Sequence, residues 1–194
     1  MNSIRLRELQ RGDFRNPVQF LVSLRALEPE VSNSNLDERI KQLRTNSLNE
    51  WRQVREAALF CFGMAQRIGR PVYLRRGESQ DYDFVAAWDV GDERHFAPVQ
   101  MKEVVPEPLN ANSSLEKVIQ SLTKYVDSHD LTVAIHLNRQ IHFDPKTLVV
   151  PRLRIAALWI FGSITPDQSE WGLWGNFLEE PVGTRFAYPR FDET

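Results

Sequence analysis

The stretch Pro71–Val105, PVYLRRGESQDYDFVAAWDVGDERHFAPVQMKEVV, decides the fold. It predicts three short strands, because runs of strand-forming residues alternate in it with polar and turn-forming residues. The predicted strands are Val72–Leu74, Phe84–Trp88 and Phe96–Val105, and the polar turn 91–94 separates the last two. We therefore expect the second and third strands to be adjacent in one sheet.

The third predicted strand carries two polar side chains that share a face. Side chains alternate along a strand, so Gln100 and Lys102 lie on one side and Met101 lies broadly on the other. Asp83 stands where the second strand begins, so pairing of these strands would bring Asp83, Gln100 and Lys102 together. A carboxylate, an amide oxygen and an ammonium group suit a divalent cation and an attacking water. The alternative is a turn aspartate with Gln100 and Lys102 on the solvent face of an edge strand.

Asp83 before an apolar strand, followed by Gln100-Met-Lys102 in the next strand, resembles the PD-(D/E)XK phosphodiesterase superfamily of restriction-endonuclease-like folds. It is most similar to the branch whose last motif is Gln-X-Lys, as in methylation-directed restriction enzymes. The resemblance spans roughly Ser47–Asn138, in the order helix, three strands, helix, strand. The sequence departs from the family pattern at Tyr82, where a proline is usual, and at Gln100, where an acid is commoner.

The resemblance implies a central mixed β-sheet flanked by helices and a Mg²⁺- or Mn²⁺-dependent endonuclease acting on DNA. Asp83, the Gln100 amide oxygen and the Met101 carbonyl would hold the cation, since Mg²⁺ prefers hard oxygen ligands. Lys102 would orient the attacking water or stabilise charge on the phosphate. An amide in place of a second carboxylate weakens cation binding unless another acid compensates.

In this family a glutamate on the preceding helix often completes the cation site, and the chain offers two candidates. Glu56 fits by its distance from the strands. It points away, however, from the apolar stripe of the predicted helix 48–68, which includes Val54, Ala58 and Cys61. Glu50 lies beside that stripe. The alternative for either residue is a solvated or capping acid.

Two helices flank the predicted strands. The first covers 48–68, with Ser47 and Glu50 at capping-box spacing and Gly69 as the terminating residue. The second covers 114–127, and its Lys117 and Lys124 are candidate contacts for a phosphate backbone. Further candidates for DNA contact are Arg152 and Arg154.

We expect an N-terminal helical extension at residues 1–46 and the nuclease-like domain at residues 47–194. The two together form one compact domain. In the extension, 18–24 could be a short strand or a helical turn. A buried strand is expected at Leu131–Leu137, and its His136 is more readily a hydrogen-bonded structural histidine than a metal ligand; the same holds for His142.

The C-terminal third is rich in aromatic residues. Periodicity does not decide whether 155–161 is a helix or a strand. The aromatic side chains predict the core of a C-terminal layer; the alternative is a stacking platform for bases or a self-association surface. That alternative would suit a catalytically inactive nuclease-fold module that binds a protein partner or itself. The aromatic residues are Trp159, Phe161, Trp171, Trp174, Phe177, Phe186 and Tyr188.

Composition limits the possible functions. The chain has 194 residues and a formal net charge of −2, which argues against non-specific coating of nucleic acid but not against one local basic groove. Cys61 is the only cysteine, so no intrachain disulfide can form, and a reducing compartment is expected. The N-terminal sequence lacks an apolar core of signal-peptide length, and no apolar run could span a bilayer. We therefore expect a cytoplasmic protein without membrane contact.

Overall fold

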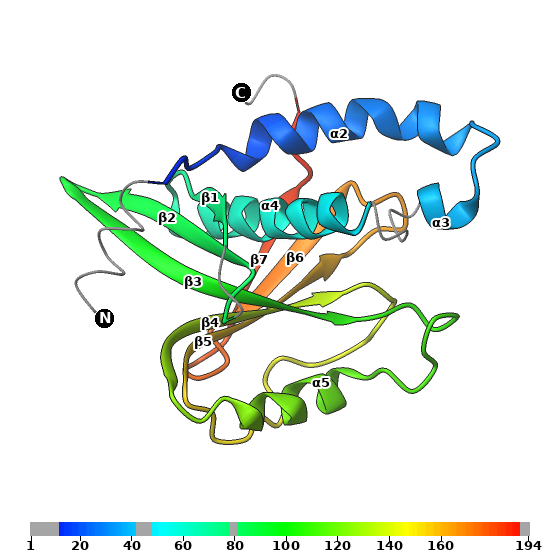
Figure 1. The fold of residues 1–194 in the computed structure, drawn as a ribbon. Helices are drawn as coiled ribbons and strands as arrows, with labels where there is room; N and C mark the ends of the chain where they lie inside the picture. The colour runs from blue at the N-terminus through cyan, green and yellow to red at the C-terminus, as the bar shows by residue number, and fades with distance from the viewer. Residues whose placement is uncertain (1–11, 42–47, 78–80, 191–194) are drawn as a thin grey trace.

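The computed structural model describes residues 12–41, 48–77 and 81–190, which form a seven-stranded mixed sheet with helices on both faces (Figure 1). The helices are α2 (Pro17–Ser32), α3 (Glu38–Lys41), α4 (Asn49–Ile68) and α5 (Leu115–Ser121), which the 3₁₀ turn η1 (Leu122–Lys124) follows. The strands are β1 (Tyr73–Arg76), β2 (Phe84–Val90), β3 (Glu93–Val104), β4 (Ser128–Leu137), β5 (Ile155–Ser163), β6 (Glu170–Gly175) and β7 (Val182–Ala187). The prediction of a central mixed sheet flanked by helices is confirmed.

The strands lie side by side in chain order from β1 to β7. The predicted pairing of the second and third strands is confirmed, because β2 and β3 are antiparallel with Phe84 opposite Val99. Strands β3, β4 and β5 run parallel, and the other neighbouring pairs are antiparallel. A parallel neighbour requires a crossover, and α5 supplies the one from β3 to β4. The segment 155–161, whose periodicity left helix and strand open, belongs to β5.

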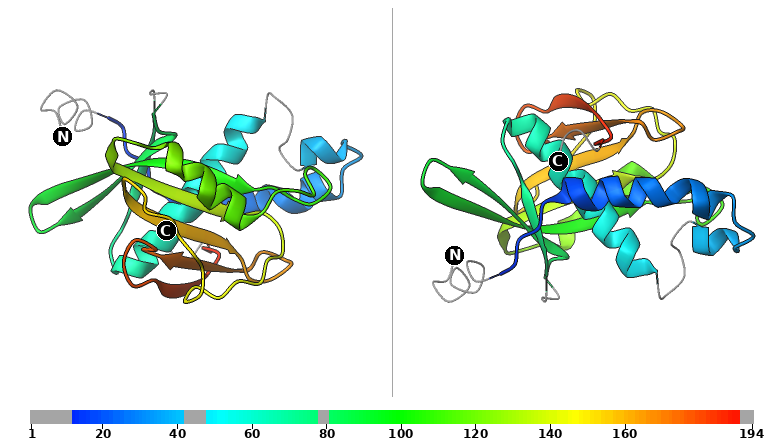
Figure 2. Two further views of the ribbon diagram at one scale, coloured as in Figure 1. Left: turned by 90° about the horizontal axis from the view of Figure 1, so that it is seen from below. Right: turned by 90° about the horizontal axis from the view of Figure 1, so that it is seen from above.

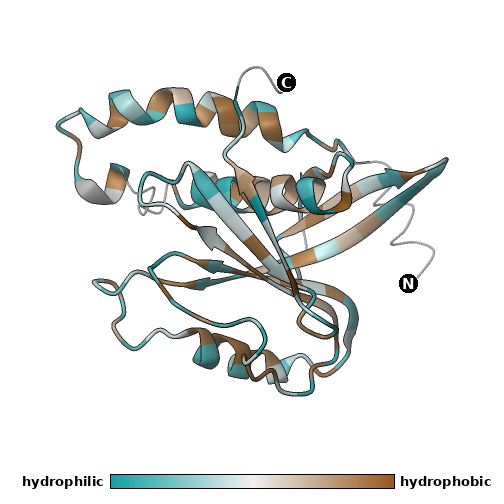
Figure 3. Ribbon diagram, turned by 180° about the vertical axis from the view of Figure 1, so that it is seen from behind, coloured by the Kyte–Doolittle hydropathy of each residue, from teal (hydrophilic) through white to brown (hydrophobic). Residues whose placement is uncertain are grey.

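The sheet separates two apolar cores. Figure 1 shows α4 on one face and α5 on the other. On β4, Ala134 packs into the core under α4, whereas Val133 and Ile135 pack into the core against α5. The alternation of side chains along β4 therefore fills both cores from one strand. Figure 3 shows brown apolar segments along the helices and the strands between them, whereas the projecting tip of the β2–β3 hairpin is hydrophilic.

Helix α4 is buried on more than one side, because the sheet covers one flank and α2 crosses the other (Figure 2). Its residues 56–63 are all buried. Gly69 ends the helix as predicted: it takes the left-handed conformation (φ 67°, ψ 29°), and its N–H bonds to the Ala65 carbonyl. The structure does not describe Ser47, so the proposed capping box cannot be placed. Leu48 stands at the N-cap, and no side chain bonds there.

The N-terminal helix shares the core of the α4 face. The Asn16 side chain caps α2 and Pro17 occupies its first turn, so 18–24 is helical rather than extended. Leu21 is fully buried, and its carbonyl accepts a hydrogen bond from the Tyr188 hydroxyl at 3.0 Å. This bond ties α2 to the segment that follows β7.

The second predicted helix is shorter than expected. The prediction of a helix through 127 is wrong, because α5 ends at Ser121 and η1 at Lys124. Tyr125 is extended (ψ 93°), and Val126, whose spacing from Leu122 would continue the apolar face of a helix, is 66% exposed. The chain must turn here to enter β4 at Ser128, and this overrides the apolar spacing.

The C-terminal aromatic side chains belong mainly to the core. Five of the seven are buried, and the other two, Trp159 and Trp174, are half-buried. They therefore leave no fully exposed stacking platform. None of the helices in the described ranges combines the length and the apolar composition that crossing a membrane requires.

We expect Tyr188→Phe to lower the free energy of unfolding by about 1 kcal/mol at neutral pH, because the buried Leu21 carbonyl loses its donor. Burial raises the pKa of Tyr188 to about 12, from an ordinary value near 10. The unfolded chain therefore loses this proton first as the pH rises, and wild-type stability falls between about pH 10 and 12. Denaturant unfolding across this pH range should show that the difference in the free energy of unfolding between the wild type and Tyr188→Phe becomes smaller. Tyr73→Phe is the control, and a constant difference would contradict the assignment.

Candidate active site

Asp83 immediately precedes β2 and closes the ladder between β2 and β3. Its backbone N–H donates to the Val99 carbonyl at 2.9 Å. Its carboxylate oxygen Oδ2 accepts the Met101 N–H at 2.6 Å and also accepts the side-chain amide of Gln100. Asp83 itself is exposed. The carboxylate is thus fixed in orientation and still open to solvent, as a cation site requires.

The backbone of Met101 points to the same place. Where a strand pairs, the N–H and C=O of one residue point to the same neighbour. The Met101 N–H points to Asp83, beyond the last residue of β2, so its carbonyl oxygen is directed into the space beside that carboxylate. The predicted ligand set of Asp83, Gln100 and the Met101 carbonyl is therefore brought together.

Lys102 joins this group from the α5 face of β3. It is half-buried opposite Ile135, a member of the α5-side core. Burial lowers the pKa of the Lys102 ammonium, and attraction to Asp83 offsets this only in part. Gln100 lies on the same face of β3 as Lys102, and its amide contacts the Asp83 carboxylate, so this carboxylate approaches the α5 face of the sheet. The folded protein therefore holds an amine with an increased tendency to release its proton.

Tyr125 adds a group from the end of η1. Burial raises the pKa of its hydroxyl, Lys124 lowers it, and the negative charge of Asp83 raises it further. The Lys124 ammonium lies 5.5 Å from the centre of the Tyr125 ring. The sequence analysis missed Tyr125 because it lies beyond α5 in an extended segment.

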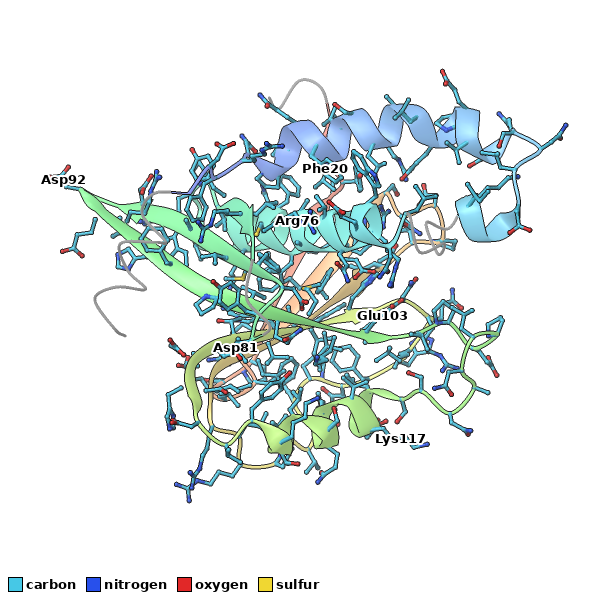
Figure 4. The ribbon with its side chains drawn as sticks, in the orientation of Figure 1. Phe20, Arg76, Asp81, Asp92, Glu103 and Lys117 are labelled. Atoms are coloured by element: carbon cyan, nitrogen blue, oxygen red, sulfur yellow. The ribbon has the colours of Figure 1, made fainter. Side chains whose placement is uncertain are left out.

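The four candidate DNA contacts are distributed unevenly. Lys124 lies beside Tyr125, and Arg154 donates to the Val126 carbonyl at 3.3 Å, so both flank the end of α5 nearest Asp83. Arg152 is exposed in the segment before β5. Lys117 lies in the first turn of α5, where its ammonium donates to the Asn112 carbonyl, and Figure 4 shows it on the solvent side.

Neither helix glutamate contacts Asp83. Glu56 is buried on the α4 face, and Glu50 is exposed and pairs with Arg76. In the described ranges, no hydrogen bond or ion pair joins either one to the Asp83 carboxylate. The helical wheel misplaced Glu56, because the apolar stripe is not the only inward side of a helix covered by both a sheet and α2.

Glu56 instead belongs to a second polar cluster on the opposite face of the sheet. Arg52 lies between two carboxylates, with Nη1 2.5 Å from Glu103 Oε2 and 3.4 Å from Glu56 Oε1. His136 Nδ1 lies 3.4 Å from Glu56 Oε1. Figure 4 shows Glu103 on the side of β3 that faces α4. Sequence analysis overlooked Glu103, although its alternation with Lys102 places it on this face.

The cluster opens into a cleft of about 690 Å³ between α2, α4 and the loops after β4 and β5. His136 forms part of the wall, stacked on Phe161 with ring centres 4.9 Å apart. His136 is buried, as expected for a structural histidine. It is not hydrogen-bonded through Nδ1, because this atom has no hydrogen-bond partner within the described ranges. His142 is exposed.

Comparison of the chain with protein-family models, curated proteins and solved structures found no match.

Lys102→Met should stabilise the metal-free protein at neutral pH, because burial disfavours the charged amine more than Asp83 favours it. The unfolded chain keeps the lysine proton to a higher pH than the folded chain, so wild-type stability rises with pH in this window. The melting temperatures of the wild type and of Lys102→Met should therefore converge as the pH rises from 7 to about 10.5. The exposed Lys146→Met is the control. A destabilised Lys102→Met at neutral pH would show that the attraction to Asp83 outweighs the cost of burial.

Proposed function

We propose that the chain is a Mg²⁺-dependent phosphodiesterase that cleaves DNA, with a restriction-endonuclease-like fold. The observation that carries the proposal is the arrangement at the end of β2. The Asp83 carboxylate, the Gln100 amide and the backbone of Met101 come together there, and Lys102 lies on the same face of β3 as Gln100. The order α4, three strands, α5 and β4 agrees with the PD-(D/E)XK arrangement.

The donor set fits a hard cation. Asp83 offers an exposed carboxylate, and the Met101 carbonyl is directed beside it. The Gln100 amide presents its nitrogen to Asp83 and would have to turn over to present its oxygen. Oxygen donors of this kind suit Mg²⁺ or Mn²⁺. A bound cation would polarise the phosphate and lower the pKa of a water molecule.

Lys102 is the residue suited to proton transfer. Its pKa is lowered by burial, which increases the fraction of neutral amine that can accept a proton from the attacking water. In its charged form the same group would stabilise the negative charge that develops on the phosphate. The negative charge of Asp83 would attract both the cation and the Lys102 amine.

The surroundings of the site provide local positive charge for a phosphate backbone. Lys124 and Arg154 flank the α5 end of the site, and Arg152 lies two residues before Arg154. Because the whole chain carries a net charge of −2, DNA binding must depend on these few residues and should be modest, with a logarithmic salt slope of about 0.9 for each phosphate neutralised.

Nicking of supercoiled plasmid in Mg²⁺ or Mn²⁺ tests the activity. We expect the wild type to nick, Asp83→Asn to be inactive, and Lys102→Ala to lose a factor of about a hundred or more in rate, because each removes a group that acts on the reacting phosphate. The exposed Lys146→Ala serves as a matched control and should nick like the wild type. A wild type that does not nick with either cation contradicts the proposal, as does equal nicking by all four proteins.

Gln100→Glu tests whether Gln100 is a cation ligand. The change restores a carboxylate beside Asp83 at equal side-chain length, so Mn²⁺ should bind more tightly in a calorimetric titration. In chelator the two neighbouring acids should lower the melting temperature. If Gln100 is only a surface residue, the variant should match the wild type to within about 0.5 kcal/mol with and without Mn²⁺.

The alternative function, a catalytically inactive module that binds a partner through its C-terminal aromatic residues, has less support. Those side chains are buried or half-buried, so they contribute little surface to a partner. Gln100 stands where the resembled family commonly has an acid, and this departure would suit an inactive module. The nicking test distinguishes the two functions.

A further inference from the structure

Glu56, Glu103 and His136 bring three metal-ligand atoms together from three separate elements. They come from α4, β3 and β4, and one ligand atom from each lies within 4.8 Å of the other two. Glu56 and His136 are buried, and the Glu103 side chain is 14% exposed. The cluster lies across the sheet from Asp83, because Glu103 alternates with Lys102 along β3.

The imidazole of His136 is the second, independent observation. Its Nδ1 is buried and has no hydrogen-bond partner among the described residues. It lies 3.4 Å from Glu56 Oε1 in an orientation that makes no hydrogen bond. Two ligands held about 2.1 Å from a tetrahedral Zn²⁺ ion are about 3.4 Å apart. The pair is therefore spaced as the ligands of one tetrahedral ion are.

Arg52 supplies positive charge at this place in the metal-free protein. Its Nη1 contacts both carboxylates, and its Nη2 donates to the Asn49 side chain at 2.6 Å. One guanidinium offsets only one of the two carboxylates, and its own Nε is buried without a partner in the described ranges. Arg52 also lines the cleft, so its side chain has space into which it can turn.

We infer that Glu56, Glu103 and His136 form a Zn²⁺ site, which binds the ion in exchange for Arg52. An imidazole nitrogen with two carboxylates favours a transition metal over Mg²⁺, in contrast to the oxygen donors around Asp83. Two carboxylates balance the charge of a divalent ion. Asn138 donates to Glu103 Oε1 at 2.7 Å and so orients that ligand from outside the site.

The fourth coordination position faces the cleft, whose wall includes Glu56, His136 and Asn138. Three protein ligands with one open position are the arrangement of zinc sites that accept a water or a substrate oxygen. The inference does not rely on the proposed phosphodiesterase, because the two groups lie on opposite faces of the sheet and share no residue.

The test is a calorimetric titration of the metal-free chain with Zn²⁺, together with melting curves in Zn²⁺ and in chelator. We expect one tightly bound ion whose binding does not depend on Asp83, and a higher melting temperature with Zn²⁺. Glu103→Gln and His136→Gln should each weaken binding by about a hundred-fold or more. Asp83→Asn, which alters only the group on the other face, should bind Zn²⁺ like the wild type.

Arg52→Met separates a metal site from a purely structural ion-pair network. In chelator the variant should melt lower than the wild type, because two carboxylates are left without their guanidinium. Zn²⁺ should then restore its stability and bind more tightly than to the wild type, since the competing cation is gone. A variant that stays destabilised in Zn²⁺ would overturn the inference.

Co²⁺ provides a readout on the wild type itself, in case a variant does not fold. In a tetrahedral site this ion absorbs strongly in the visible range, whereas octahedral Co²⁺ absorbs weakly. Strong absorption that Zn²⁺ abolishes supports the site. Weak absorption, no calorimetric binding, or binding that Glu103→Gln and His136→Gln leave unchanged would overturn it.

Discussion

The alternation of side chains along β3 is the constraint on which both polar groups depend. Val99 is fully buried in the core under α4, and Val104 is fully buried in the core against α5. A slip of one residue would move every side chain of the strand to the other face, and both valines would leave their cores. The two valines therefore fix Gln100 and Lys102 on the α5 side and Glu103 on the α4 side.

The end of β2 explains why Asp83 is held so firmly. The last backbone bond from this chain segment to β3 is the one from the Asp83 N–H to the Val99 carbonyl, and in the described ranges no backbone carbonyl accepts the Met101 N–H from this side. The Asp83 carboxylate accepts that N–H and so replaces a ladder bond with a charge-assisted one. The same contact fixes the carboxylate beside the Met101 carbonyl, so termination of the ladder and assembly of the candidate cation site have one cause.

Much of the fold could be predicted from local patterns. Turn residues and alternation located β1, β2 and β3, and Gly69 located the end of α4, because these features depend on neighbours in the chain. The grouping of Asp83 with Lys102 followed from the same alternation. The pairing of Glu103 with Arg52 could not be predicted, since it depends on which flank of α4 meets the sheet. Apolar spacing did not reveal this flank, because α2 and the sheet bury α4 from two sides.

The two faces of β3 carry opposite charge imbalances, and this difference follows from burial. On the α5 side, the lowered pKa of Lys102 shows that the exposed Asp83 compensates its buried charge incompletely. On the α4 side, Arg52 stands between two carboxylates and can offset only one of them. A buried charge without full compensation favours binding of the opposite charge, because the cost of removing it from water has already been met in folding. The α5 face therefore holds an incompletely compensated amine at Lys102, whereas the α4 face holds excess negative charge between Glu56 and Glu103. One strand, alternating between two cores, thus places groups of opposite charge on its two sides.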